Sequence, residues 1–102
     1  MEQLFTITGT TLTIHLPAEL DHHSSEGIRG EADRIIRSRN IRRVLFDFEK
    51  TVFMDSSGIG IIIGRYRKIS SFGGKVYAIH ADDRIQRILI ASGMTSIIEV
   101  LS

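Results

Sequence analysis

The chain has 102 residues, of which 42% are hydrophobic and 25% charged, and its formal net charge is +1. This length and composition are those of one folded domain and exclude an intrinsically disordered chain. The lack of cysteine excludes disulfides and thiolate metal sites. The longest apolar run, residues 59–64, is far shorter than the roughly 20 residues of a membrane helix, and residues 1–3 do not begin a signal peptide. We therefore predict a cytoplasmic protein without a membrane span.

The first half of the chain is predicted to form a hairpin followed by a helix. Residues 4–7 and 11–16 have strand character, the second with apolar residues at alternate positions, and Thr8-Gly9-Thr10 is a suitable turn between them. Residues 24–39 have apolar residues at helical spacing. We expect Ser24 or Ser25 to cap this helix and Asn40 to end it in a left-handed conformation.

The rest of the chain alternates between strands and helices. Residues 44–48 are almost continuously apolar, as in a strand covered on both faces. A helix at residues 56–71, a strand at 76–79, a helix capped by Asp82 or Asp83, and a last strand at 97–100 are predicted to follow. Such an order requires parallel strands. We therefore predict a single α/β domain spanning residues 1–102, in which helices pack on a mixed β-sheet.

The segment before the second helix has the strongest functional signal. Asp55 or Ser56 can cap this helix, because either side-chain oxygen can accept a hydrogen bond from a free backbone N–H. The helix N-terminus also offers N–H donors and a positive dipole end to a phosphate on an exposed Ser56. Such a phosphate would spare the fold and obstruct a docking partner. The residues alone also allow Asp55, Ser56 and Ser57 to serve only as a cap.

Three glycines in the same helix suggest a close contact. Gly60 and Gly64 are four residues apart, so they give the helix a bare face near Ser56 that a partner can approach. Gly58 belongs to the same first turns. Ile61 lies outside the apolar stripe, so it is either an exposed contact for a partner or partly covered by a neighbouring helix.

Other chemistries have less support. The glycine spacing is not that of a dinucleotide-binding or P-loop motif, and Ser56 has no signature base, so we do not expect an enzyme. A module that binds a nucleotide or small ligand at this helix N-terminus is the alternative. His22 and His23 follow Asp21; adjacent histidines make a weak zinc site, so we predict a polar loop that helps to cap the helix or contacts a partner. No metal ion or cofactor is expected.

Basic residues form two groups, at positions 34–43 and 65–68. They are most simply explained as solvated charges near helix C-termini. No nucleic-acid-binding motif accompanies them, and only Tyr66 and Tyr77 could stack on bases. Direct nucleic-acid binding is therefore not expected.

Two stretches of the sequence are similar to a known family. Asp55-Ser56-Ser57-Gly58-Ile59-Gly60, with Ile62-Ile63-Gly64-Arg65-Tyr66 after it, resembles the phosphorylation loop and helix of anti-sigma factor antagonists, which are single STAS domains. Glu19-Leu20-Asp21-His22-His23 resembles the loop after the first hairpin in the sporulation (sigma-F) branch. The similarity covers nearly the whole chain and implies a STAS fold. Members of the family usually continue into a further C-terminal helix, whereas this sequence ends at Leu101-Ser102.

The resemblance implies a partner-switching cycle. The unphosphorylated antagonist binds an anti-sigma factor that is also a serine kinase, and so frees the sigma factor. The kinase phosphorylates the first serine of the pair, here Ser56, which ends the interaction, and a serine phosphatase restores it. On this interpretation the residues that contact the partner are Asp21, His22, His23, Asp55, Ser56, Ser57, Gly58, Gly60, Ile61 and Gly64.

Overall fold

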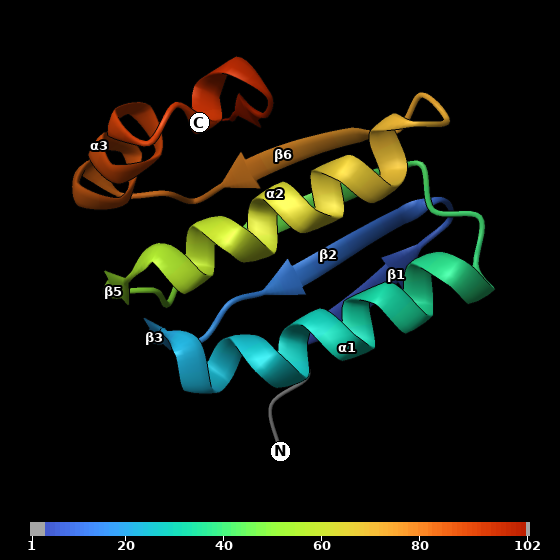
Figure 1. Ribbon diagram of the computed structural model, residues 1–102, viewed down its shortest axis with the longest axis horizontal. Coiled ribbons are helices and arrows are strands. Elements are labelled where there is room, and N and C mark those ends of the chain that lie inside the picture. The colour runs from blue at the N-terminus through green and yellow to red at the C-terminus, as the bar shows by residue number, and fades with distance from the viewer. Residues whose placement is uncertain (1–3, 102) are drawn as a thin grey trace.

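A computed structural model describes residues 4–101, and its centre is a five-stranded sheet with the order β1-β2-β4-β6-β7 (Figure 1). β1 (Phe5–Thr8) and β2 (Thr11–His15) form the predicted antiparallel hairpin, with Gly9 at φ +59° in its turn. β4 (Arg43–Asp47), β6 (Lys75–Ile79) and β7 (Glu99–Val100) extend the sheet with parallel pairings. The predicted mixed sheet is therefore confirmed.

Two long helices lie side by side across one face of this sheet (Figure 1). They are α1 (His22–Ser38) and α2 (Ser56–Ser70), and both turn an apolar side toward the strands. The third helix, α3 (Asp83–Ala91), lies past the end of β6, and a 3₁₀ turn, η1 (Met94–Ser96), connects it to β7. The core between the two layers includes fully buried side chains from the sheet and from α2: Leu12, Ile14, Val44, Phe46, Ile62 and Ile69.

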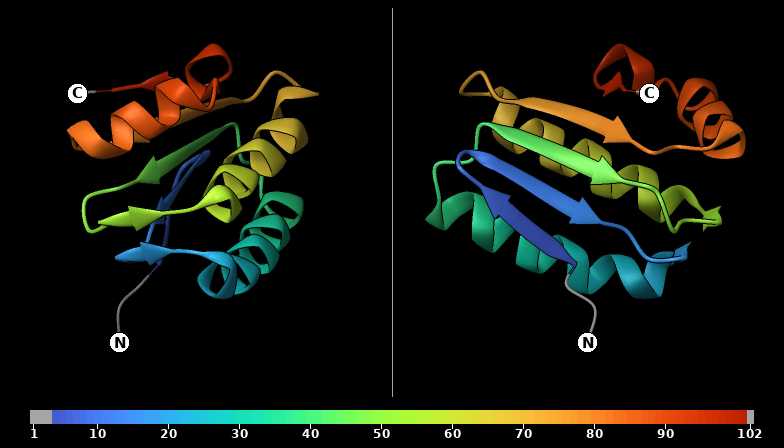
Figure 2. Two further views of the ribbon diagram at one scale, coloured as in Figure 1. Left: turned by 60° about the vertical axis from the view of Figure 1, so that its left-hand side comes forward. Right: turned by 180° about the vertical axis from the view of Figure 1, so that it is seen from behind.

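The opposite face of the sheet has no helix over it in the part of the chain that the structure describes (Figure 2, right). The prediction that residues 44–48 are covered on both faces is therefore wrong. Val44 and Phe46 are fully buried on the helical side, but Leu45, which points the other way, is only half-buried. Leu45 lies between Thr13 of β2 and Tyr77 of β6, and these neighbours shield it in part.

α1 begins earlier and ends differently than predicted. Its N-cap is Asp21, whose Oδ1 accepts a hydrogen bond from the Ser24 N–H at 3.0 Å, while the Ser24 hydroxyl accepts from the Asp21 N–H at 3.1 Å. Ser24 is thus the third helical residue of a capping box, not the cap. At the other end, Arg39 leaves the helix with φ −128°. Asn40 does not adopt the left-handed conformation that was predicted for it.

The C-terminal elements follow the sequence signals more closely. Oδ1 of Asp82 accepts a hydrogen bond from the Ile85 N–H at 2.9 Å, so Asp82 is the predicted cap of α3. Gly93 has φ +80°, and the next residue, Met94, is 5% exposed and folds back onto the core. The last strand is shorter than predicted, because the chain completes η1 before it reaches Glu99.

Two short strands outside the main sheet were not predicted. β3 (Glu19–Leu20) and β5 (Phe53–Met54) pair in parallel as a separate two-stranded ribbon (Figure 2, left). Strands of this length have no visible hydrophobic period, so pattern analysis cannot detect them. Their position matters, because each one leads into a helix.

Candidate functional site

The two-stranded ribbon brings the N-termini of α1 and α2 together. β3 leads directly into Asp21, the N-cap of α1, and β5 leads directly into Asp55, the N-cap of α2. Leu20 is aligned with Met54, and the Asp55 N–H donates to the carbonyl oxygen of Leu20 at 3.2 Å. The two segments that the sequence singled out, residues 19–23 and 55–60, therefore lie next to each other at one end of the helical layer (Figure 2, left).

At the start of α2, the capping group and the candidate phosphate acceptor are different residues. Oδ1 of Asp55 accepts a hydrogen bond from the Ser57 N–H at 2.8 Å, and the Asp55 carbonyl accepts from the Gly58 N–H at 3.0 Å. Ser56 is the first residue of the helix and is exposed. Because Asp55 provides the cap, modification of the Ser56 hydroxyl leaves the capping bond intact.

Gly58 is an internal packing position, not part of an open face. It is buried, and a Cβ placed on it would lie 2.5 Å from Cγ of Met54 and 2.9 Å from Cδ2 of Leu20. Neither distance is possible without movement of the neighbouring side chains. We therefore correct the interpretation of Gly58 as a partner contact: the missing side chain lets α2 lie close against the ribbon.

Ile61 is also buried, with 2% of its surface exposed. Of its two possible roles, that of an exposed apolar contact is therefore wrong. One turn later, Arg65 is 3% exposed, and its Nε lies 2.9 Å from Oδ1 of Asp33 on α1. α2 packs against α1 as well as against the sheet, so its buried surface is wider than the single apolar stripe that the sequence suggested.

The bare face predicted for α2 is present at Gly60 and Gly64. Gly60 is exposed and Gly64 half-buried, and a Cβ on either would meet no atom within 4 Å. Gly60 lies one turn after Ser56 on the same side of the helix. A phosphate on Ser56 would thus stand at one end of a surface that has no side chains of its own.

The first turn of α1 contributes exposed polar residues to the same end of the molecule. His22 and His23 are the first two residues of the helix, and both are exposed, so they do not form the predicted loop. Asp21, the N-cap that precedes them, is half-buried. The hydrogen bond from the Ser24 backbone N–H is the main cause that holds the pKa of Asp21 below its ordinary value. Asp21 and Asp55 thus place two carboxylates at adjacent helix N-termini.

Two exposed apolar residues beside this site were not predicted. Val52 is 59% exposed and Phe53 50% exposed, immediately before Met54 and Asp55. Successive side chains in a strand point to opposite sides, so Phe53 faces outward because Met54 faces inward. Recognition of β5 as a strand would have indicated this, and these residues can supply the apolar contact that Ile61 cannot.

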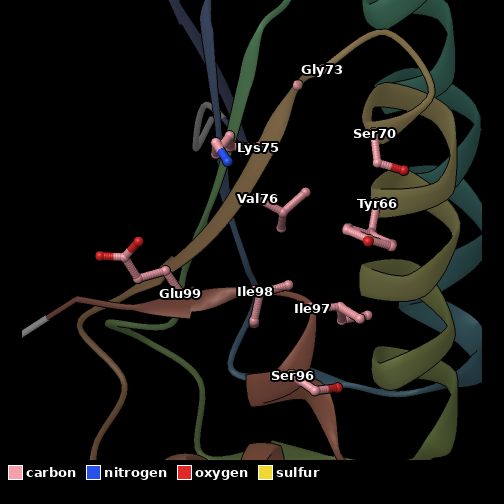
Figure 3. Close-up of a pocket in the computed structure, with 10 residues that line it drawn as sticks. Tyr66, Ser70, Gly73, Lys75, Val76, Ser96, Ile97, Ile98 and Glu99 are labelled. Atoms are coloured by element: carbon pink, nitrogen blue, oxygen red, sulfur yellow. The ribbon is translucent and has the colours of Figure 1, made fainter.

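One hollow beside α2 lies away from the N-terminus of the helix (Figure 3). It has a volume of about 430 Å³ and is bordered by the C-terminal half of α2, by β6 and by the chain before β7. Tyr66, Val76 and Ile97 point into it, whereas Lys75 and Glu99 point away from it (Figure 3). A small molecule held there would not contact the capped end of α2, so this hollow does not support the ligand-sensing alternative.

The sequence of the chain matches a known protein family. The sequence pattern of the STAS domain matches residues 4–102. The chain belongs to the STAS domain family. It is 35% identical over 89 residues to the anti-sigma F factor antagonist of Paenibacillus polymyxa, with 87% of this chain and 76% of that protein covered. It is 32% identical over 92 residues to the protein of that description from Lysinibacillus sphaericus, with coverage of 90% and 79%.

Solved structures show the same fold. The anti-sigma factor antagonist SpoIIAA in its unphosphorylated form superimposes with a TM-score of 0.81 at 28% identity, over 98% of this STAS domain and 86% of SpoIIAA. The Bacillus cell fate determinant SpoIIAA in the phosphorylated form gives a TM-score of 0.78 at 30% identity, over 98% and 90%. The STAS fold predicted from the sequence is confirmed.

Membrane insertion by a helix has no support in the described part of the chain. None of the helices within residues 4–101 combines the length and the apolar character that a membrane span requires. The prediction that residues 1–3 do not begin a signal peptide falls outside the described residues.

Proposed function

We propose that this STAS domain is an anti-sigma factor antagonist of the sigma-F type, switched by phosphorylation of Ser56. In the unphosphorylated state it binds an anti-sigma factor, which then releases its sigma factor. The observation that carries the proposal is the position of Ser56, which is exposed at the first residue of α2 and lies next to the N-terminus of α1. Two relatives, 35% and 32% identical to the chain, are anti-sigma F factor antagonists.

The docking surface in this proposal is formed by the exposed residues around the two helix N-termini. His22 and His23 contribute from α1, Phe53 from the ribbon, and Ser56 and Gly60 from α2. An apolar side chain with polar groups around it is the usual composition of a protein interface. Gly60 lets the partner backbone approach α2 closely, because no side chain stands in the way.

Phosphorylation affects the fold and the docking surface differently. A phosphate adds about −1.5 to −2 charges, which the free N–H groups and the dipole of α2 can accommodate. A docked partner, in contrast, would have to remove that charge from water beside the carboxylate of Asp55, and burial of a charge without a counter-charge is costly. We therefore expect phosphorylation to weaken docking strongly and to change the stability of the domain little.

The rest of the cycle follows from the same proposal. The anti-sigma factor is itself the serine kinase and uses ATP to phosphorylate Ser56, and a serine phosphatase reverses the modification in the cytoplasm. The domain acts as a binding module and not as an enzyme. A serine nucleophile needs an oriented base. The rings of His15 and His80 are held by Asp47, and among the described residues no hydrogen bond orients the exposed rings of His22 and His23.

The decisive experiment is site mapping after phosphorylation. The chain is incubated with its anti-sigma factor and ATP, and its intact mass and phosphopeptides are measured. We expect a single phosphate on Ser56, none on the Ser56→Ala variant, and unchanged modification of the matched Ser57→Ala variant. A phosphate on Ser24 or Ser70 would contradict the site. Saturable nucleotide binding by the isolated chain, without any phosphate transfer, would instead favour the ligand-sensing alternative.

A further inference from the structure

A cluster of histidine and carboxylate side chains lies at the edge of the main sheet where the parallel strands end. His15 is the last residue of β2, Asp47 is the last residue of β4, and His80 directly follows β6. These strands are neighbours, and their register aligns His15 with Asp47, and Asp47 with Ile79. The carboxyl ends of parallel strands are where open α/β sheets commonly bind ligands.

Asp47 is the buried centre of the cluster, since only 8% of its side chain is exposed. Its Oδ2 lies 2.9 Å from Nδ1 of His15, and its Oδ1 lies 2.8 Å from Nδ1 of His80. Oδ1 also accepts a hydrogen bond from the Glu49 N–H at 3.0 Å. The other ring nitrogen of His15, Nε2, lies 2.9 Å from the Thr6 hydroxyl. The orientations of Asp47 and His15 are therefore fixed before any ligand arrives.

The Glu49 side chain completes a set of donor atoms. One atom each from Asp47, Glu49 and His80 lie within 4.8 Å of one another. Zinc binds imidazole nitrogen and carboxylate oxygen at roughly 2.0–2.2 Å, so three donors at this separation reach one ion after small side-chain movements. Glu49 and His80 are exposed, which gives an ion access from solvent.

Compensation of the buried Asp47 charge does not explain all of this cluster. Two histidine rings and one backbone N–H already satisfy the Asp47 carboxylate. The Glu49 side chain, in contrast to its backbone N–H, makes no hydrogen bond to Asp47 and brings a second negative charge close to His80. With neutral imidazoles the cluster has excess negative charge, which is the electrostatic condition that a bound divalent cation relieves.

We propose that Asp47, Glu49 and His80 bind one divalent transition-metal ion, with Zn²⁺ as the reference case, and that His15 is a positioning residue. Oδ1 of Asp47, a carboxylate oxygen of Glu49 and Nδ1 of His80 are the ligands, and water fills the open positions. The ion takes the place of the proton between His80 and Asp47. Oδ2 of Asp47 keeps its hydrogen bond with His15, as the carboxylate ligands of metal sites commonly do.

The donor set selects the class of ion. An imidazole nitrogen favours Zn²⁺, Ni²⁺ or Co²⁺ over Mg²⁺ and Ca²⁺, which prefer oxygen ligands alone. The sequence expectation of no metal ion rested on His22 and His23, which lie on α1 and contribute nothing to this cluster. The register of β4 and β6 brings Asp47 close to His80, and Glu49 follows Asp47 by two residues.

The site also has a defined relation to the N-terminus of α2. Glu49 lies on the connection from β4 to β5, and β5 leads into Asp55 and Ser56. His80 lies on the connection from β6 to α3. A bound ion would therefore tie the connection between β4 and β5, which precedes Ser56, to the connection that follows the neighbouring strand β6.

Calorimetric titration of the tag-free full chain with ZnCl₂, in a buffer that does not bind metals, tests the proposal. We expect saturation at one ion per chain and loss of measurable binding in His80→Asn; asparagine tolerates the φ of +58° at this position. His15→Ala should weaken binding by about 10- to 100-fold, the usual effect of a residue that orients a ligand. The matched control is a His22→Asn, His23→Asn double variant, which should bind as the wild type does.

Two results would overturn the proposal. One is the absence of saturable binding by the wild type. The other is binding that persists in both His80→Asn and Glu49→Gln, whether or not it disappears in the double variant of His22 and His23. Glu49 is exposed, so Glu49→Gln tests the ligand set even if a change at His80 disturbs folding. Zinc should also shift the imidazole NMR signals of His80 and leave those of His22 and His23 in place.

Discussion

Two positions on α2, Ser56 at its N-terminus and Arg65 further along, differ in what their side chains contact. At the N-terminus, Ser56 is exposed and Gly60 leaves open surface beside it. Further along the same helix, Arg65 is 3% exposed and pairs with Asp33 of α1. An exposed group can gain or lose charge while water solvates it in both states, but a buried charge depends on its partner. One helix can therefore carry an exposed residue that can be modified and a buried ion pair that holds the helix against α1.

The largest expected effect is the loss of stability when the buried ion pair between Asp33 and Arg65 is broken. Asp33→Ala leaves the Arg65 guanidinium buried without a counter-charge, which should lower the free energy of unfolding by about 3 kcal/mol. Urea unfolding of the variant measures this loss. Ser56→Ala is the matched change at the exposed end, and it should cost less than about 0.5 kcal/mol.

A second variant separates charge from packing in that result. Arg65→Met in the Asp33→Ala background removes the uncompensated charge and fills a similar volume, so much of the lost stability should return. Equal stabilities for Asp33→Ala and Ser56→Ala would contradict the claim that the buried ion pair stabilises the fold more than the exposed Ser56 side chain does.

Two glycines in α2 provide a comparison in which the same substitution has opposite signs. Gly58→Ala forces a Cβ against Met54 and Leu20, and overpacking of about 1–3 kcal/mol outweighs the gain of up to about 1 kcal/mol in helix propensity. Gly60→Ala meets no atom within 4 Å, so it should stabilise the domain by up to about 1 kcal/mol. Thermal unfolding of both variants gives the signs, and destabilisation by Gly60→Ala would mean that its surface is not open.

The smallest expected effect is the pH dependence of stability that arises from the buried carboxylate of Asp47 and its partner His80. Burial alone would raise the pKa of Asp47, but hydrogen bonds from His80, the Glu49 backbone N–H and His15 hold it below its ordinary value of 3.8. The hydrogen bond with Asp47, and the charge of Asp47, raise the pKa of His80 above 6.5. The contribution of His80 to stability is therefore complete below pH 6.5 and is lost as the pH rises through the raised pKa of His80. The contribution of Asp47 is present above pH 3.8 and is lost as the pH falls below that value.

The measurement for this effect is unfolding of the wild type and His80→Asn across pH, with a chelator present to exclude metal ions. The difference in the free energy of unfolding should be largest between pH 3.8 and 6.5 and should shrink above that range. A difference that grows as the solution becomes more alkaline would show that the hydrogen bond between His80 and Asp47 does not stabilise the fold.

The sequence predicted the elements whose signals are local. The hairpin, α2 and the cap of α3 each depend on residues a few positions apart, and all three are confirmed. The start of α1 was missed because Asp21-His22-His23 looks like a polar loop until its capping box with Ser24 is seen. β3 and β5 were missed because two residues cannot display a period.

The parts of the candidate site that could not be predicted depend on contacts between distant residues. Ile61 and Gly58 have ordinary helical positions in the sequence, and only the packing of α2 on α1 and on the ribbon shows that they are buried. The cluster of His15, Asp47 and His80 is created by strand register, because these residues are more than thirty positions apart. Ser56, in contrast, was predicted as the phosphate acceptor from its immediate neighbours together with the resemblance to anti-sigma factor antagonists.

The most direct test of the central claim compares the Ser56-phosphorylated domain with the unmodified domain in two measurements on the same samples. We expect phosphorylation to abolish measurable binding to the anti-sigma factor and to shift the melting temperature by less than about 4 °C, which corresponds to roughly 1 kcal/mol or less for a domain of this size. A large drop in melting temperature would show that Ser56 serves the fold through the helix cap. Undiminished binding by the phosphorylated domain would show that this end of α2 does not control docking.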